Sequence, residues 1–202
     1  MDTATLTKWF EEGKKMKRTI RATTALAALV CAALTVAASG QTMATGGSKS
    51  TPPPMADEPP ILPTGLGPVI DRDIETLRAA TQRFKVASAA IAEGYVAEDR
   101  CIAYQPHGAM GYHFNNSALK DAVLDIQKPE VLVYEKAPDG TFRLNGVEFI
   151  VPIAAWTKTE PPKIMGQDLK RADSLGIWYL HVWNWRYSPS GLFADWNPRV
   201  KC

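Results

Sequence analysis

The chain has 202 residues, with 23 Lys and Arg, 21 Asp and Glu, and a formal net charge of +2. Residues 1–40 hold six of the basic and three of the acidic residues, which leaves 17 basic and 18 acidic residues and a net charge near −1 in the remainder. Nucleic-acid binding requires clustered positive charge, so we expect no nucleic-acid partner.

The N-terminal 40 residues end in the three-part pattern of a secretory signal peptide. From Met16, a short basic start leads into an apolar run of about 14 residues, which closes with small residues before Gln41. This run is shorter than the ~20 residues of a membrane-spanning helix, although a membrane anchor is the alternative. We predict cleavage before Gln41 and export to the periplasm or the medium, with no transmembrane span left. Met16 begins the pattern better than Met1 and is the predicted translation start; a long basic leader is the alternative.

The rest of the chain divides into a tether and one domain. Residues 41–68 are rich in Pro, Gly, Ser and Thr and predict a flexible linker. Residues 69–202 carry periodic apolar patterns and are long enough to bury a single core.

The clearest predicted element is a helix over residues 71–94. Apolar side chains recur there at intervals of three and four residues, including Ile74, Leu77, Phe84 and Ile91. Asp71 is placed as an N-cap, and Gly94 fits the position just past the end.

After residue 94 the apolar period changes to two. Apolar and polar residues alternate over residues 129–153, on both sides of the turn residues 138–140, which predicts a β-hairpin. Residues 176–193 show the same alternation. Shorter predicted elements are strands at 101–105 and 110–115 and helices at 117–127 and 166–176. Together these elements predict an α+β fold, with one long N-terminal helix packed on a mostly antiparallel sheet of four to five strands.

Two cysteines, Cys101 and Cys202, remain once the signal segment is removed. In an exported chain such a pair predicts a disulfide, and a metal-binding pair is the alternative.

A histidine- and glutamate-based site is the main chemical candidate. His113, Glu148 and His181 come from three predicted strands. A carboxylate on an apolar strand is costly unless it is paired or binds a cation. Two imidazoles and one carboxylate are a common donor set for a divalent transition metal. We predict that the three side chains lie close together, and two interpretations stay open: a site for a metal or polar ligand, and a hydrogen-bonded structural cluster.

Neighbouring side chains are predicted to form a ligand pocket beside this site: Asn115, Glu135, Tyr179 and Trp183. In the stretch GAMGYHFNN, residues 108–116, the glycines are expected to leave room beside His113, and Asn115 to orient its ring. A hairpin without a bulge would put Glu135 on one face with Leu144 and Glu148. Alternation likewise puts Trp183 and Trp185 on the face of His181. The tryptophans between 178 and 196 fit either a large core near the disulfide or an aromatic pocket.

Five motifs together resemble an uncharacterised family of exported bacterial proteins: GYVAEDRC, GAMGYHFNN, PEVLVYE, LNGVEFIVP and LHVWNWRYSPSGLFADWNPRVKC. The resemblance extends from about residue 70 to the end and implies no reaction. A fainter similarity to other bacterial domains of unknown function directs attention to His113 and Glu148.

The amino-acid sequence leaves three functions open. The chain has no GxSxG, HExxH, Walker, GxGxxG or CxxCH motif, so the common nucleophilic hydrolases have no support. The first function is an exported, non-enzymatic protein that binds a metal or small ligand at the His/Glu site. The second is a metal-dependent enzyme using the same residues. The third is a structural or interaction module of the bacterial envelope.

Overall fold

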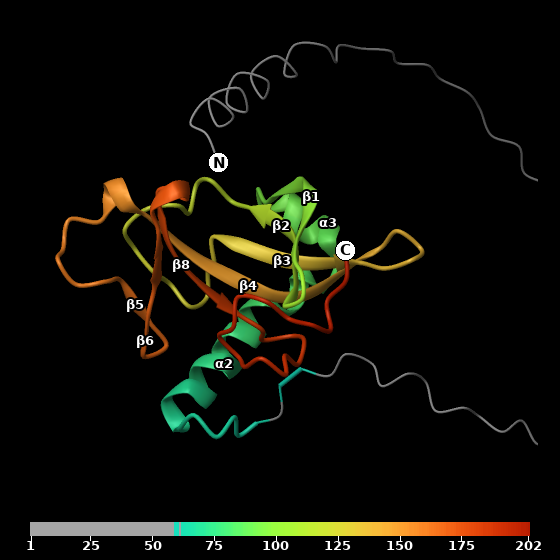
Figure 1. Ribbon diagram of the computed structural model, residues 1–202, viewed down its shortest axis with the longest axis horizontal. Helices are drawn as coiled ribbons and strands as arrows, with labels where there is room; N and C mark the ends of the chain where they lie inside the picture. The colour runs from blue at the N-terminus through green and yellow to red at the C-terminus, as the bar shows by residue number, and fades with distance from the viewer. Residues whose placement is uncertain (1–58, 61) are drawn as a thin grey trace, which may run out of the picture. The chain divides into compact units, whose positions relative to one another are not determined.

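The computed structural model describes residues 59–60 and 62–202 (Figure 1). The predicted signal peptide, and the predicted tether as far as residue 58, lie outside the described residues. In the part that the structure describes, no helix has the length and apolar character needed to cross a membrane.

One antiparallel sheet of six strands forms the centre of the domain, in the order β1-β2-β3-β4-β8-β7. Its strands are β1 (Val96–Tyr104), β2 (Gly108–Asn115), β3 (Val131–Lys136), β4 (Phe142–Pro152), β7 (Lys170–Ala172) and β8 (Ile177–Val182). A separate short ribbon pairs β5 (Lys163–Ile164) with β6 (Gln167–Asp168). The fold is therefore of mixed helix and sheet, as predicted, with more strands than the four to five expected.

The predicted helix is present but broken in two. It forms as α2 (Pro68–Thr81), the 3₁₀ turn η2 (Gln82–Lys85) and α3 (Ala87–Ala92), with Val86 extended between them. The hydroxyl of Tyr134 donates a hydrogen bond of 2.7 Å to the carbonyl of Phe84, which takes that carbonyl away from helical pairing. A single uninterrupted helix is thus wrong, because the sheet beneath it supplies a competing donor.

The start of α2 also differs from the prediction. A proline occupies the first helical position, where its missing N–H costs nothing. Asp71 lies inside the first turn and is not the N-cap. Its carboxylate accepts hydrogen bonds from the amide and the hydroxyl of Thr64, at 2.7 and 2.6 Å. These bonds hold part of the predicted linker segment against α2.

Both of the predicted short helices are wrong. Residues 117–127 form turns, since the carboxylates of Asp121 and Asp125 bond to amides two residues on and compete with helical pairing. Residues 166–176 contain β6, β7 and only one 3₁₀ turn, η4 (Asp173–Leu175). β7 pairs with β8, so tertiary pairing overrides the local helical pattern there.

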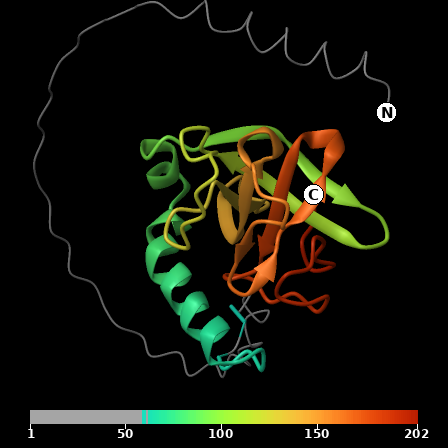
Figure 2. The same ribbon diagram turned by 90° about the vertical axis from the view of Figure 1, so that its left-hand side faces the viewer.

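The two faces of the sheet are covered differently. One face packs against the helices and carries the main core, with Ile74, Leu77 and Phe84 set against Phe114, Leu132 and Phe149. Figure 2 shows α2 running along that side of the sheet. The other face carries a small apolar cluster, Ala109, Val133, Trp183 and Val200, which the C-terminal segment completes.

A bulge in β4 decides which residues share a face. Val133 pairs with Gly146, but the next pair is Tyr134 with Leu144, so Asn145 is an extra residue. Leu144 therefore joins the helix-side core, and the expected grouping of Leu144 with Glu135 is wrong. Glu135 and Glu148 do share the opposite face.

Two glycines allow strands of the sheet to approach more closely than any other residue would permit. A Cβ at Gly111, where φ is 115°, would lie 2.3 Å from the carbonyl oxygen of Tyr134. A Cβ at Gly146 would lie 2.4 Å from the carbonyl oxygen of Val182. The expectation that Gly108 and Gly111 leave room beside His113 is wrong, because the backbone of Asn197 fills the space at Gly108 and the backbone of Tyr134 fills it at Gly111.

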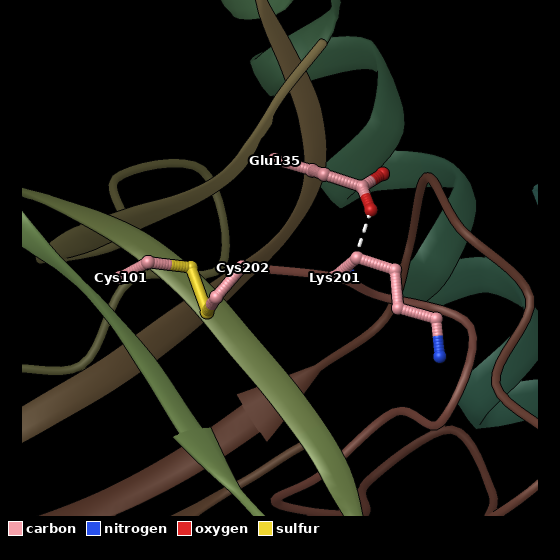
Figure 3. Close-up of a disulfide and its surroundings, with 4 residues drawn as sticks. All are labelled: Cys101, Glu135, Lys201 and Cys202. Atoms are coloured by element: carbon pink, nitrogen blue, oxygen red, sulfur yellow. Dashed lines mark hydrogen bonds between the residues drawn. A yellow bond between two sulfur atoms is a disulfide. The ribbon is translucent and has the colours of Figure 1, made fainter. Parts of the chain in front are cut away.

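The predicted disulfide is present. Cys101 on β1 is bonded to Cys202, with 5.6 Å between the Cα atoms and 101 residues of separation (Figure 3). Closing so long a loop restricts the unfolded chain by about 4–5 kcal/mol in the entropic description. The bond fastens the last residues of the chain to the first strand of the sheet.

Gly111→Ala tests the close backbone contact. We expect unfolding free energy to fall by about 3 kcal/mol or more, because the left-handed φ costs ~1–3 kcal/mol and the clash adds about as much. Gly140→Ala is the control: Gly140 also has positive φ (85°), but a Cβ there meets nothing within 4 Å. Equal losses in urea denaturation of the two variants would show that the contact with Tyr134 does not matter.

Candidate functional site

The structure brings His113, Glu148 and His181 together. They come from β2, β4 and β8, and one ligand atom from each lies within 4.8 Å of the others. Nε2 of His113 is 3.8 Å from Oε2 of Glu148, and Nε2 of His181 is 3.6 Å from Oε1. The carboxylate therefore lies between the two imidazoles and directs one oxygen to each.

Curvature of the sheet makes this meeting possible. Glu148 and His181 are direct cross-strand partners, but two strands separate His113 from His181. Strands about 4.8 Å apart would put these histidines about 14 Å apart in a flat sheet. Their ring centroids are only 5.8 Å apart. The sheet curls around the three side chains, and the close contacts at Gly111 and Gly146 lie within that curl.

The three side chains are buried, and two of their ring nitrogens are left without hydrogen-bond partners among the described residues. His113 and Glu148 are each 7% exposed, and His181 is 1% exposed. Nδ1 of His113 and Nε2 of His181 are buried and have no hydrogen-bond partner within residues 59–60 and 62–202. An unsatisfied buried polar atom costs roughly 1–3 kcal/mol. A group bound between the three side chains would offset this cost.

Burial also sets the protonation states. It lowers the pKa of His113 to about 4, with the positive charge of Lys120 adding to the effect. Burial lowers the pKa of His181 well below its usual value, and His113 and Lys170 add to this. The pKa of Glu148 is raised to about 8 by burial, against the opposing effect of Lys120. At neutral pH the metal-free site therefore holds two neutral imidazoles and a protonated carboxyl group.

This donor set suits a metal ion after a modest contraction. Bonds of ~2.1 Å at tetrahedral angles put ligand atoms about 3.4 Å apart. Two of the distances here are already 3.6 and 3.8 Å. The imidazoles are neutral, as ligands must be, and binding would displace one proton from Glu148.

The other predicted pocket residues next to the site have partners of their own. Nδ2 of Asn115 donates to Glu98 at 2.7 Å, and its Oδ1 accepts from Lys120 at 2.6 Å. Asn115 thus forms a polar bridge beside His113 and does not orient its ring. Half-buried Tyr179 lies two residues before His181, with its hydroxyl 3.4 Å from Asp195.

Glu135 lies apart from the three site residues. Its Oε1 accepts a hydrogen bond of 2.8 Å from the amide of Lys201. Its Oε2 lies 3.0 Å from Arg186 and 3.5 Å from Arg143. Glu135 therefore holds the C-terminal segment in place, and its charge is balanced by guanidinium groups.

The tryptophans are packing residues in the described structure. Trp183 is fully buried with Val133 and Val200, and its indole N–H donates to the carbonyl of Ala194 at 2.6 Å. Its ring also lies 5.4 Å from that of His181. Trp185 lies beyond the end of β8 and bonds to Thr81 on α2, so its predicted place beside His181 is wrong.

Sequence reasoning missed one buried carboxylate near the site. Glu130 is 1% exposed, and its Oε2 accepts a hydrogen bond of 3.0 Å from the amide of Ile150. Burial raises its pKa to about 8. Glu130 directly precedes β3. At the point where β3 and β4 stop pairing, its side chain accepts the hydrogen bond of the Ile150 amide in place of a backbone carbonyl. No sequence signal distinguishes it from an exposed glutamate before a strand.

Comparisons of the chain with protein-family models, with curated proteins and with solved structures gave no significant match.

Glu148→Gln tests the raised pKa of this carboxyl. The two histidines, neutral in the folded state and with an ordinary pKa of 6.5, titrate on unfolding in wild type and variant alike. Only wild type has Glu148, which keeps its proton up to about pH 8 only in the folded state. Its contribution to stability is complete below the ordinary pKa of 4.5 and is lost as pH rises through about 8. In urea denaturation with a chelator present, the variant should lack this loss, which amounts to at most about 1.4 kcal/mol per pH unit.

The control is the exposed Glu160→Gln, which should keep the wild-type pH dependence. If wild type and Glu148→Gln have the same pH dependence, Glu148 is ionised in the folded protein and the assignment is wrong.

Proposed function

We propose that this protein binds one divalent transition-metal ion through His113, Glu148 and His181. The observation that carries the proposal is the convergence of two imidazoles and a carboxyl group within 4.8 Å in a buried place, where Nε2 of His181 has no hydrogen-bond partner among the described residues. A bound ion would satisfy Nε2 of His181, which faces Glu148, and would balance the carboxylate. This is how buried charges are usually retained.

The donor types favour zinc, iron or a similar ion. Imidazole suits first-row transition metals, whereas magnesium and calcium prefer sites made of oxygen atoms. Thiolate ligation by Cys101 and Cys202 has no support, because they are joined to each other.

A purely structural hydrogen-bonded cluster is the competing explanation. In such a cluster a ring N–H would donate to Glu148 at hydrogen-bond length, close to 2.7–3.2 Å. The observed separations of 3.6 and 3.8 Å are longer than that. They suit ligands disposed around an ion better than a cluster of direct hydrogen bonds.

Binding is a better-supported role than catalysis. A catalytic ion keeps a coordination position open to substrate. Here the donors are at most 7% exposed, and Asn115, bonded to Lys120, lies beside His113. A tightly held ion with a structural or storage role fits this enclosure.

The compartment we propose is an oxidising one outside the cytoplasm. The disulfide supports it, since such bonds persist mainly in exported proteins. The signal-like pattern before Gln41 supports the same location.

Metal titration tests the proposal. Metal-free wild type should bind Co²⁺ or Zn²⁺ with 1:1 stoichiometry in isothermal titration calorimetry. His181→Ala and His113→Ala should each lose at least about tenfold in affinity, since ligands matter at least as much as the groups that orient them. His107→Ala is the control, because that imidazole stacks on Tyr104, away from the site. Equal binding by all four proteins would place the ion elsewhere, and no binding by wild type would overturn the proposal.

A further inference from the structure

We propose that the C-terminal segment, residues 197–202, is a clamp that positions His181 through Trp183, and that the Cys101–Cys202 bond thereby sets the affinity of the metal site. This inference rests on the proposed metal binding. It adds Trp183 as a residue that positions a ligand, and it makes the metal affinity depend on the Cys101–Cys202 disulfide.

The clamp is fastened to the sheet at three places. Ala109 at the start of β2 and Asn197 exchange two backbone hydrogen bonds, of 3.2 and 3.1 Å. The amide of Lys201 donates to Glu135 on β3, while the Lys201 ammonium points away from it (Figure 3). The disulfide then joins the last residue to β1.

Val200 connects the C-terminal segment to the face of the sheet that carries the metal site. It is 1% exposed and packs with Ala109, Val133 and Trp183. Val133 is the cross-strand partner of His113. Val200 therefore contacts β2, which carries His113, through Ala109, and the residue that directly follows β8, which carries His181.

Trp183 carries the contact to His181. The two rings lie 5.4 Å apart between centroids, at 43°. Trp183 is itself fixed, since its amide donates to the carbonyl of Leu192 at 3.0 Å and its indole N–H donates to that of Ala194 at 2.6 Å. In the part of the chain that the structure describes, Nε2 of His181 has no hydrogen-bond partner. Packing against Trp183 therefore helps to fix the angle of that imidazole.

Residues that orient a metal ligand without touching the ion change affinity by about 10–100-fold when they are altered. Loosening the clamp lets the His181 ring rotate and lets water reach the site, and both effects weaken binding. The same change leaves the helix-side core intact.

The double variant Cys101→Ser/Cys202→Ser removes the bond without thiol reductants, which themselves bind transition metals. Its dissociation constant for Co²⁺ should rise about tenfold, within the range seen for groups that orient ligands. Val200→Ala, with the disulfide intact, opens the contact with Trp183 and should weaken binding in the same direction. This second variant keeps the test valid if the double variant does not fold.

Leu77→Ala is the matched control. Leu77 is as deeply buried as Val200 but lies on the helix side of the sheet. It should lose stability in urea while keeping the wild-type dissociation constant and Co²⁺ absorption spectrum. Trp183→Phe keeps an aromatic ring against His181 and should retain more affinity than Trp183→Leu.

The outcomes separate the two proposals. Weaker binding and an altered Co²⁺ spectrum in the clamp variants, with Leu77→Ala unchanged, support the clamp. Equal constants for wild type, Val200→Ala and the disulfide variant overturn the clamp and leave the metal site standing. Failure of wild type to bind overturns the metal site, and the clamp with it.

Discussion

The candidate site depends on the close approach of backbone to backbone at two glycines. At Gly111 and Gly146, a neighbouring strand's carbonyl oxygen lies within 2.3 and 2.4 Å of the position that a Cβ would take. These contacts accompany the curl that brings His113 and His181 to 5.8 Å between ring centroids. Since side chains on the inside of a curved sheet converge, residues from strands that are not neighbours can share one ion.

The two faces of the sheet make opposite contributions to the stability of the fold. Large apolar side chains on the helix side, including Phe84 and Phe149, bury area worth roughly 1.5–3 kcal/mol each. The opposite face holds three titratable groups whose pKa values burial has moved toward their neutral forms. The apolar face and the disulfide stabilise a fold in which this polar cluster is retained at a cost. A bound ion would offset part of that cost.

Much of this architecture could be predicted from patterns of polarity. The period of the first helix, the Asp139–Gly140 hairpin and the pairing of two cysteines each follow from local rules. The interruption at Val86 could not be predicted, because it depends on the hydroxyl of Tyr134, 50 residues away in the sequence. Tertiary pairing likewise converted the predicted helix at 166–176 into strands.

The candidate site, too, could be predicted from the sequence only in part. Residue type and strand period singled out His113, Glu148 and His181, but spacing in one chain carries no information on how far a sheet curls. The β4 bulge at Asn145 inverted the faces of the hairpin beyond it, so Leu144 joined the core. Glu130 was missed because its role, replacing a backbone acceptor for Ile150, exists only once the strands are paired.

X-ray absorption spectroscopy of the zinc-loaded protein tests the central claim most directly. Our account predicts a shell of nitrogen and oxygen at about 2.0–2.1 Å, with the outer-shell scattering of two imidazoles and no sulfur. A sulfur shell near 2.3 Å, or the absence of imidazole scattering, would show that the ion is held by other residues. Either result would contradict a metal site at His113, Glu148 and His181.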